Sequence, residues 1–298
     1  MSEPYATRVS RRVFLRRLMA GTCVALCLTA AGCANFFTSG NDDERLNQIL
    51  VSSVEALRDN DYDKAVRLCD EGLVLSPGHS AFLINKSIAL RLRGVARFNA
   101  SLKLDDGAAR ASEKEIARRD IVAAETVATE AVSQWKSPSV WDRLWRDEPY
   151  EANKLAALAA RGQALCVLAA RFDKSRASEA RAASHEYLKL ETDSERRRQG
   201  YLYNGQMLLD AGHGAEAAEE YRQVLAVDPD NLDATLGAGL ALFQTGDKAQ
   251  YEQASAHLRR FVERAPENHP LRTSAKETLD FISQNGAPPA ARGGEIRR

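Results

Sequence analysis

The residues whose spacing most suggests chemistry lie at 212–217. Gly212-His213-Gly214-Ala215-Glu216-Ala217 matches the pattern GxGxxA, in which glycines let the backbone approach a pyrophosphate at the start of a helix. That function requires a β-strand before the first glycine. The residues ahead of Gly212 have helical spacing instead, so we interpret the two glycines as a turn between helices and expect no nucleotide site.

The other groups able to do chemistry form no recognisable constellation. The five histidines, at 79, 185, 213, 257 and 269, do not pair with a second metal ligand in a known helical motif. There is no GxSxG, no P-loop and no isolated pair of carboxylates in an apolar setting. We expect no catalytic residue, no metal and no cofactor, and therefore not an enzyme.

An internal repeat accounts for more of the sequence. Three segments each place an alanine twelve residues before a proline, and the pairs are Ala65 and Pro77, Ala217 and Pro229, and Ala254 and Pro266. A small alanine lets two helices of a hairpin touch, while apolar residues four and seven or eight positions later share its face. The proline stops the second helix, so the spacing predicts helix-turn-helix units.

This pattern resembles the tetratricopeptide repeat, a helical hairpin of about 34 residues. Tyr201, Gly205 and Leu208 stand at the bulky, small and bulky positions of a first helix in that family. Three extra residues between Asp247 and Tyr251 predict a longer turn in the next unit. The resemblance implies an all-α solenoid of hairpins wound as a right-handed superhelix, with a degenerate helical middle section.

The predicted organisation has six parts. They are a leader at 1–32, a linker at 33–45, N-terminal hairpins at 46–104, a helical middle region with a degenerate repeat at 105–195, C-terminal repeats with a cap helix at 196–284, and a disordered tail at 285–298. Residues 108–135 are expected to form one long helix. In the degenerate unit, the second helix is expected to include Leu190. Trp135, Trp141 and Trp145 are interpreted as core residues.

The resemblance also implies a binding groove on the first helices of the C-terminal repeats. The positions that line it in the family are Leu202, Gln206, Leu209, Leu236, Leu240 and Phe243, with Gln199 and Asp233 beside them. An apolar stripe with a few amides favours apolar anchors on the ligand over charged ones. The alternative is that neighbouring helices or the cap helix fill this groove. Of the basic residues and asparagines that clamp carboxylates in some relatives only Asn85 has a counterpart, so that specificity is not expected.

The first 33 residues have the parts of an export signal. Basic residues lead into an uncharged segment, Leu18–Gly32, that is too short to span a bilayer, and Ala30-Ala31-Gly32-Cys33 resembles the lipobox of bacterial lipoproteins. The resemblance implies cleavage before Cys33 and a lipid on that cysteine; an ordinary signal peptide with an incidental cysteine is the alternative. Ser10–Arg16 resembles a twin-arginine export motif, with the basic region of a general secretory signal as its alternative.

Cleavage before Cys33 would leave two internal cysteines. Cys69 and Cys166 sit in apolar helical contexts, which is typical of small buried residues, although an exported protein could also pair them as a disulfide. Removing the leader takes away five arginines and Glu3, so 36 basic residues face 40 acidic ones and the net charge is −4. That balance gives no reason to expect nucleic acid as a partner.

Together these patterns predict a lipid-anchored interaction scaffold of the bacterial cell envelope. It would face the periplasm from the inner or outer membrane, or the cell exterior, and bind other envelope proteins or peptides. Two alternatives stay open at this point. One is an exported enzyme or cofactor-binding protein with its site in 105–195, and the other is a purely structural component that spaces envelope proteins or associates with itself.

Overall fold

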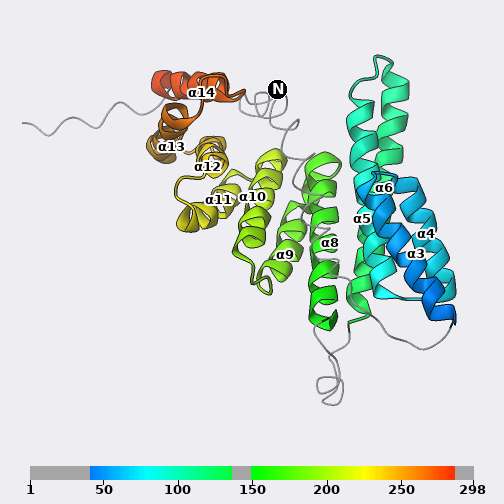
Figure 1. Ribbon diagram of the computed structural model, residues 1–298. Helices are drawn as coiled ribbons and strands as arrows, with labels where there is room; N and C mark the ends of the chain where they lie inside the picture. Colours follow the sequence, from blue (N-terminus) through cyan, green and yellow to red (C-terminus); the bar gives the residue numbers. More distant parts are fainter. Residues whose placement is uncertain (1–40, 136–148, 286–298) are drawn as a thin grey trace, which may run out of the picture. The chain divides into compact units, whose positions relative to one another are not determined.

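The computed structural model of the chain describes residues 41–135 and 149–285, and all regular structure in these two ranges is helical (Figure 1). The prediction of an all-α, hairpin-built solenoid of the tetratricopeptide type is confirmed. The predicted leader, Cys33, Trp141, Trp145 and the tail from 286 onward lie outside the described residues.

The described residues divide into two compact units, and the boundary along the chain falls between Arg196 and Arg197. The N-terminal unit contains α3 (Asn41–Arg58), α4 (Tyr62–Leu75), α5 (Ser80–Ser101), α6 (Gly107–Ser133), α8 (Pro149–Arg171), the 3₁₀ turn η2 (Lys174–Arg176) and α9 (Ala177–Leu188). Each α-helix in this series packs on the next one along the chain. This serial packing is the defining property of stacked hairpins.

Three helices of this unit have ends that bear on the predictions from the sequence. The long helix expected over 108–135 is confirmed as α6. Helix α3 already begins at Asn41, inside the segment that was predicted to be a linker at 33–45. Leu190 was expected on the second helix of the degenerate unit, but α9 ends at Leu188 and Leu190 is exposed.

Short polar side chains fix where the helices of the N-terminal unit begin. The carboxylate of Asp61 accepts a hydrogen bond from the Lys64 amide at 3.0 Å, and that of Asp106 accepts one from the Ala108 amide at 2.8 Å. Such caps satisfy amides that have no partner within the helix. Both aspartates follow the turn that ends the preceding helix, so each hairpin has a defined length.

A buried ion pair braces the centre of the N-terminal unit. Arg93 on α5 donates two hydrogen bonds to the carboxylate of Asp120 on α6, at 3.0 and 2.6 Å, and a third to Asp63 on α4. Asp120 is buried, and Arg97 also donates to it at 3.0 Å. Because the carboxylate has two arginine partners, the cost of burying it is offset, and three helices are held together.

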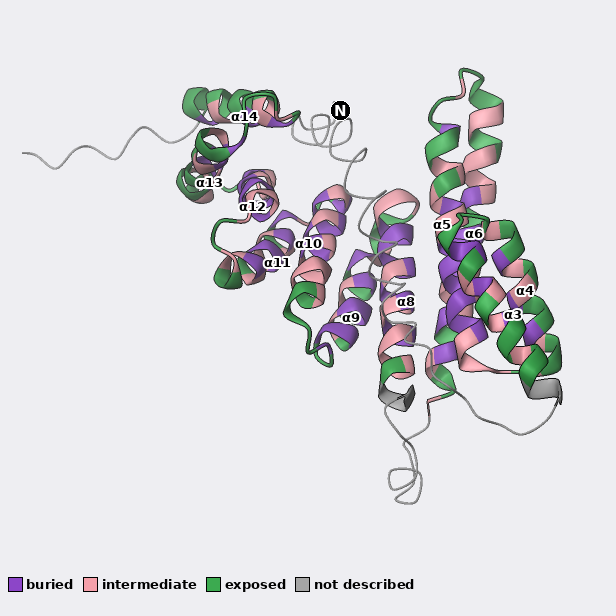
Figure 2. Cartoon of the chain, in the orientation of Figure 1, coloured by how far each residue is buried: buried purple, intermediate pink, exposed green. Residues whose placement is uncertain are grey.

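The C-terminal unit contains the repeats that the sequence shows most clearly. It consists of α10 (Ser194–Ala211), α11 (Gly214–Val227), α12 (Leu232–Gln244), the 3₁₀ turn η3 (Lys248–Gln250), α13 (Tyr251–Arg264) and α14 (Arg272–Asn285). The helices from α11 to α14 pack in sequence order. Figure 2 shows their buried residues on the sides that face neighbouring helices. The expected cap helix is confirmed as α14, and the expected longer turn contains η3.

The first glycine of the GxGxxA segment lies in a turn, as the repeat predicted, whereas Gly214 is already the first residue of α11. Gly212 has a φ of 96°, a left-handed conformation that favours glycine, and it separates α10 from α11. The residue before this turn, Ala211, ends an α-helix. The strand that a dinucleotide site requires is therefore replaced by a helix.

One aromatic ring sets the distance between three helices of this unit. Tyr221 on α11 is 1% exposed, and its ring lies against Gly205 of α10 and Gly237 of α12. A Cβ atom added at Gly205 would lie 2.8 Å from the ring carbon Cζ, and one at Gly237 would lie closer still. Only residues without a side chain allow the three helices to approach this closely.

We therefore expect Gly237→Ala to destabilise the C-terminal unit. The gain in helix propensity, about 1 kcal/mol, is outweighed by overpacking against a ring that is closed in on both sides, so the net loss should be about 1–2 kcal/mol. Urea denaturation followed by circular dichroism measures it. Gly107→Ala is the matched control, since a Cβ there meets nothing within 4 Å. Equal stabilities of the two variants would contradict this account of the packing.

Candidate functional site

Groups that could carry catalysis or bind a metal do not come together in the described ranges. Among residues 41–135 and 149–285, no group of three histidine, cysteine or acidic residues could hold a metal ion. Cys69 and Cys166 are not joined in a disulfide, and both are buried. Burial raises the pKa of the Cys69 thiol to about 12, so it is not a nucleophile at neutral pH. The surfaces of the repeat helices are the remaining candidates for a binding site.

Most of the residues predicted to line a groove lie in the core instead. Leu202, Leu209, Leu236 and Phe243 are all buried, and Leu236 is only 1% exposed. Leu236 and Phe243 belong to the apolar cluster that α12 forms with α13 and α14. The structure thus differs from the groove prediction at these four positions, and at Leu236 and Phe243, residues of α13 and α14 fill the space.

Two of the six predicted groove residues remain partly exposed to solvent. Gln206 on α10 and Leu240 on α12 are half-buried. The amide of Gln206 donates to the Asp210 carboxylate at 2.9 Å. Leu240 packs against the apolar cluster with one side only. These two side chains are therefore able to contact a partner without unfolding the helices that carry them.

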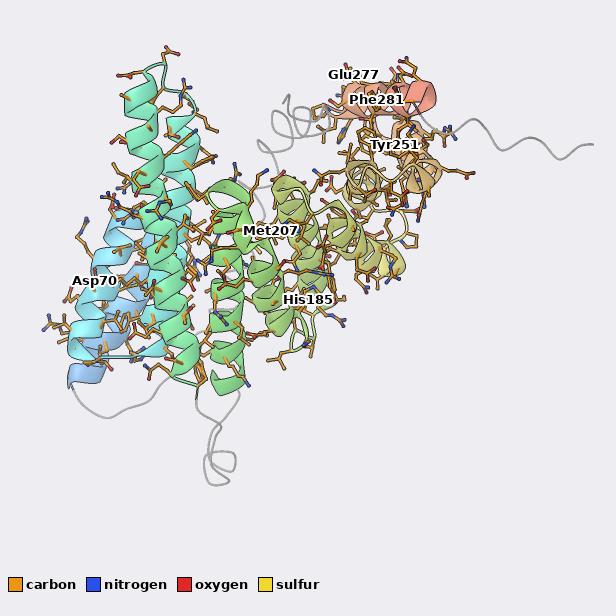
Figure 3. The ribbon with its side chains drawn as sticks, turned by 180° about the vertical axis from the view of Figure 1, so that it is seen from behind. Asp70, His185, Met207, Tyr251, Glu277 and Phe281 are labelled. Atoms are coloured by element: carbon orange, nitrogen blue, oxygen red, sulfur yellow. The ribbon has the colours of Figure 1, made fainter. Side chains whose placement is uncertain are left out.

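An aromatic cluster extends this surface onto α14. The ring of Phe243 lies 5.6 Å from the ring of Tyr251 and 5.6 Å from that of Phe281, centroid to centroid. Phe281 itself is 37% exposed, and Figure 3 marks it on α14 together with Glu277 one turn earlier. Phe281 was not among the predicted groove residues because it lies beside the apolar stripe of its helix. An aromatic residue next to such a stripe is the signal that could have found it.

Polar groups continue the surface over α10 and α12. The hydroxyl of Tyr221 points to Gln206, with 3.5 Å between the two oxygens. Burial raises the pKa of Tyr221 well above its usual value, and the charges of Asp210 and Asp233 add to this effect. Both carboxylates therefore lie within electrostatic range of the hydroxyl. Burial also raises the pKa of Asp233, against a smaller opposing effect of His269.

Contacts between the helices join these groups into one surface. The amide of Gln244 on α12 donates to the carbonyl of Leu209 on α10 at 3.0 Å, and the Phe243–Phe281 contact joins α12 to α14. We call the resulting surface the first-helix face. Its members are Gln206, Asp210, Asp233, Leu240, Gln244, Glu277 and Phe281, all of which are half-buried or exposed.

Comparisons with known proteins agree with this geometry. A family model described as tetratricopeptide repeat matches residues 208–277, a range that runs from the end of α10 through α11, α12 and α13 into α14. Searches of curated proteins and of solved structures found no match. The hairpins from α11 onward and the packing of the Tyr221 ring on Gly237 lie within the matched segment, and residues 208–277 are accordingly identified as tetratricopeptide repeat.

Proposed function

We propose that the protein is a membrane-anchored scaffold of the bacterial cell envelope, which binds a peptide or a helix of a partner protein on the first-helix face. The observation that supports this most directly is the tetratricopeptide match over 208–277, because such repeats serve protein–protein interaction. The face also supplies a half-buried leucine and an exposed phenylalanine on adjacent helices. Accessible apolar groups of this kind are typical of partner-binding surfaces.

The proposed anchor is a lipid on Cys33. Its support is the leader sequence, with a basic start, a short uncharged segment and Ala-Ala-Gly before the cysteine. No described helix has the length and hydropathy needed to cross a bilayer. Seven residues lie between Cys33 and the start of α3 at Asn41, so the two positions can be at most about 29 Å apart. A lipid at Cys33 would thus hold the N-terminal unit within that distance of the membrane.

The first-helix face is tested by site-specific photocrosslinking in the bacterium. A photoreactive residue at Leu240 should crosslink to a defined envelope protein, and Leu240→Asp should abolish that complex because it removes an apolar contact and adds a charge. Val227 is the matched control position, since it is 73% exposed at the end of α11, outside the face. Loss of the complex in Val227→Asp, or its survival in a folded Leu240→Asp variant, would count against the proposal.

The anchor is tested by changing the proposed lipid-bearing cysteine. We expect Cys33→Ser to remove the lipid mass from the mature protein and to move the protein from the membrane fraction to the soluble fraction. Mass spectrometry and fractionation measure the two effects. Cys27→Ser, within the leader, is the control and should leave both unchanged. A Cys33→Ser protein that stays membrane-bound in high salt would contradict lipid anchoring.

A further inference from the structure

We propose that the first-helix face binds a cationic segment of its partner, one in which lysines or arginines alternate with apolar side chains. This inference rests on the proposed function and adds the chemistry of the ligand. The sequence pattern alone favoured apolar anchors without charge. The acidic groups that the structure places on this face indicate that the ligand also carries positive charge.

The charge on the face is of one sign. Its three ionisable members, Asp210, Asp233 and Glu277, are all acidic, on three successive first helices. Lys276 also lies on α14, but it is five residues from Phe281 and so points roughly 140° away around the helix. An extended ligand that crosses α10, α12 and α14 would therefore meet a carboxylate on each helix.

Four arginines of the unit pair with acidic residues outside the face. Arg222 pairs with Glu219 on α11, Arg198 pairs with Asp228 at 2.8 Å, and both Arg260 and Arg264 of α13 pair with Asp230. Each of these acidic partners lies on α11 or in the turn that follows it. The acidic character of the first-helix face is therefore not neutralised by these arginines.

The lack of a basic partner for one of the carboxylates also favours a cationic ligand. Among the ion pairs of the described residues, Asp233 has no lysine or arginine partner. Asp233 is half-buried, and its desolvation raises its pKa. A carboxylate without such a partner is complementary to the N–H groups of lysine and arginine.

The apolar residues of the face indicate that apolar side chains stand between the cationic groups of the ligand. Leu240 and the exposed edge of Phe281 lie on the two helices that carry Asp233 and Glu277. A ligand that places apolar side chains on Leu240 and Phe281 and charged ones beside the carboxylates would satisfy both kinds of group. A uniformly basic chain would leave the apolar surface uncovered, so we expect the mixed segment to bind more tightly.

Two synthetic peptides test the proposal with the full chain. They share length, leucine and phenylalanine content, and differ only in carrying lysines or glutamates. The lysine peptide should bind, as measured by fluorescence anisotropy, and the glutamate peptide should not. Asp210→Asn, Asp233→Asn and Glu277→Gln should each weaken binding about two- to four-fold, and Phe281→Ser should weaken it about ten-fold. Raising the salt concentration should weaken it further.

Control variants separate a site from general attraction to an acidic protein. Glu252→Gln removes the same charge from an exposed position on α13, outside the face, and Val227→Ser removes an exposed apolar side chain. Neither should alter peptide binding. The proposal is overturned if the glutamate peptide binds as well as the lysine peptide, or if Glu252→Gln weakens binding as much as the substitutions on the face. If a partner crosslinks at Leu240 but neither peptide binds, the proposed function stands and the cationic ligand does not.

A stability measurement provides an independent test at Asp233. A raised folded-state pKa means that the protonated carboxyl contributes stability below its unfolded pKa, and that this contribution is lost as the pH rises through the folded pKa. Asp233→Asn cannot ionise, so it should be more stable than the parent protein at pH 7 and equal to it near pH 3. Urea unfolding at both pH values measures this. A variant that is less stable at pH 7, with unchanged peptide affinity, would show that Asp233 serves the fold and not a ligand.

Discussion

The contact of the Tyr221 ring with two glycines sets the spacing of the three helices on which the candidate face depends. The ring fills the space that side chains at Gly205 and Gly237 would occupy, and so fixes α10, α11 and α12 at one close spacing. A related contact occurs in the N-terminal unit, where the ring of Phe82 on α5 lies against a single glycine, Gly72 of α4. Because the ring enters from the second helix, the buried tyrosine hydroxyl reaches Gln206 of the first-helix face from the interior of the unit. A packing contact thereby also sets the polarity of the candidate site.

Close approach of the helices has a second effect on that site. When neighbouring helices lie this near to one another, large side chains on their flanks are drawn into the interior. Leu236 is buried with the residues of α13 and α14, and Phe243 is covered by Tyr251 and Phe281. The remaining accessible strip is narrower and more acidic than the family pattern suggested. Tight packing and a polar binding face are thus two results of the same constraint.

Periodicity predicted much of the fold and less of the site. The alanine-to-proline spacing located the hairpins, because helix length and termination are local properties of the chain. It could not tell that Leu240 keeps an accessible side while Leu236, four residues earlier, does not. That difference depends on where α13 and α14 lie, which is a tertiary property. Phe281 and the desolvation of Asp233 escaped prediction for the same reason, since each depends on neighbours distant in sequence.

The three extra residues of the last repeat have a consequence for the architecture. They fold into the turn η3, which begins under the cap of Asp247, whose carboxylate accepts from the Ala249 amide at 2.9 Å. The added length is absorbed before α13 starts, and Ala254, Leu258 and Phe261 still reach the core. This hairpin tip is therefore a permissive insertion point. Chain length can vary there, by natural indels or by an inserted label, while the register of the repeat is preserved.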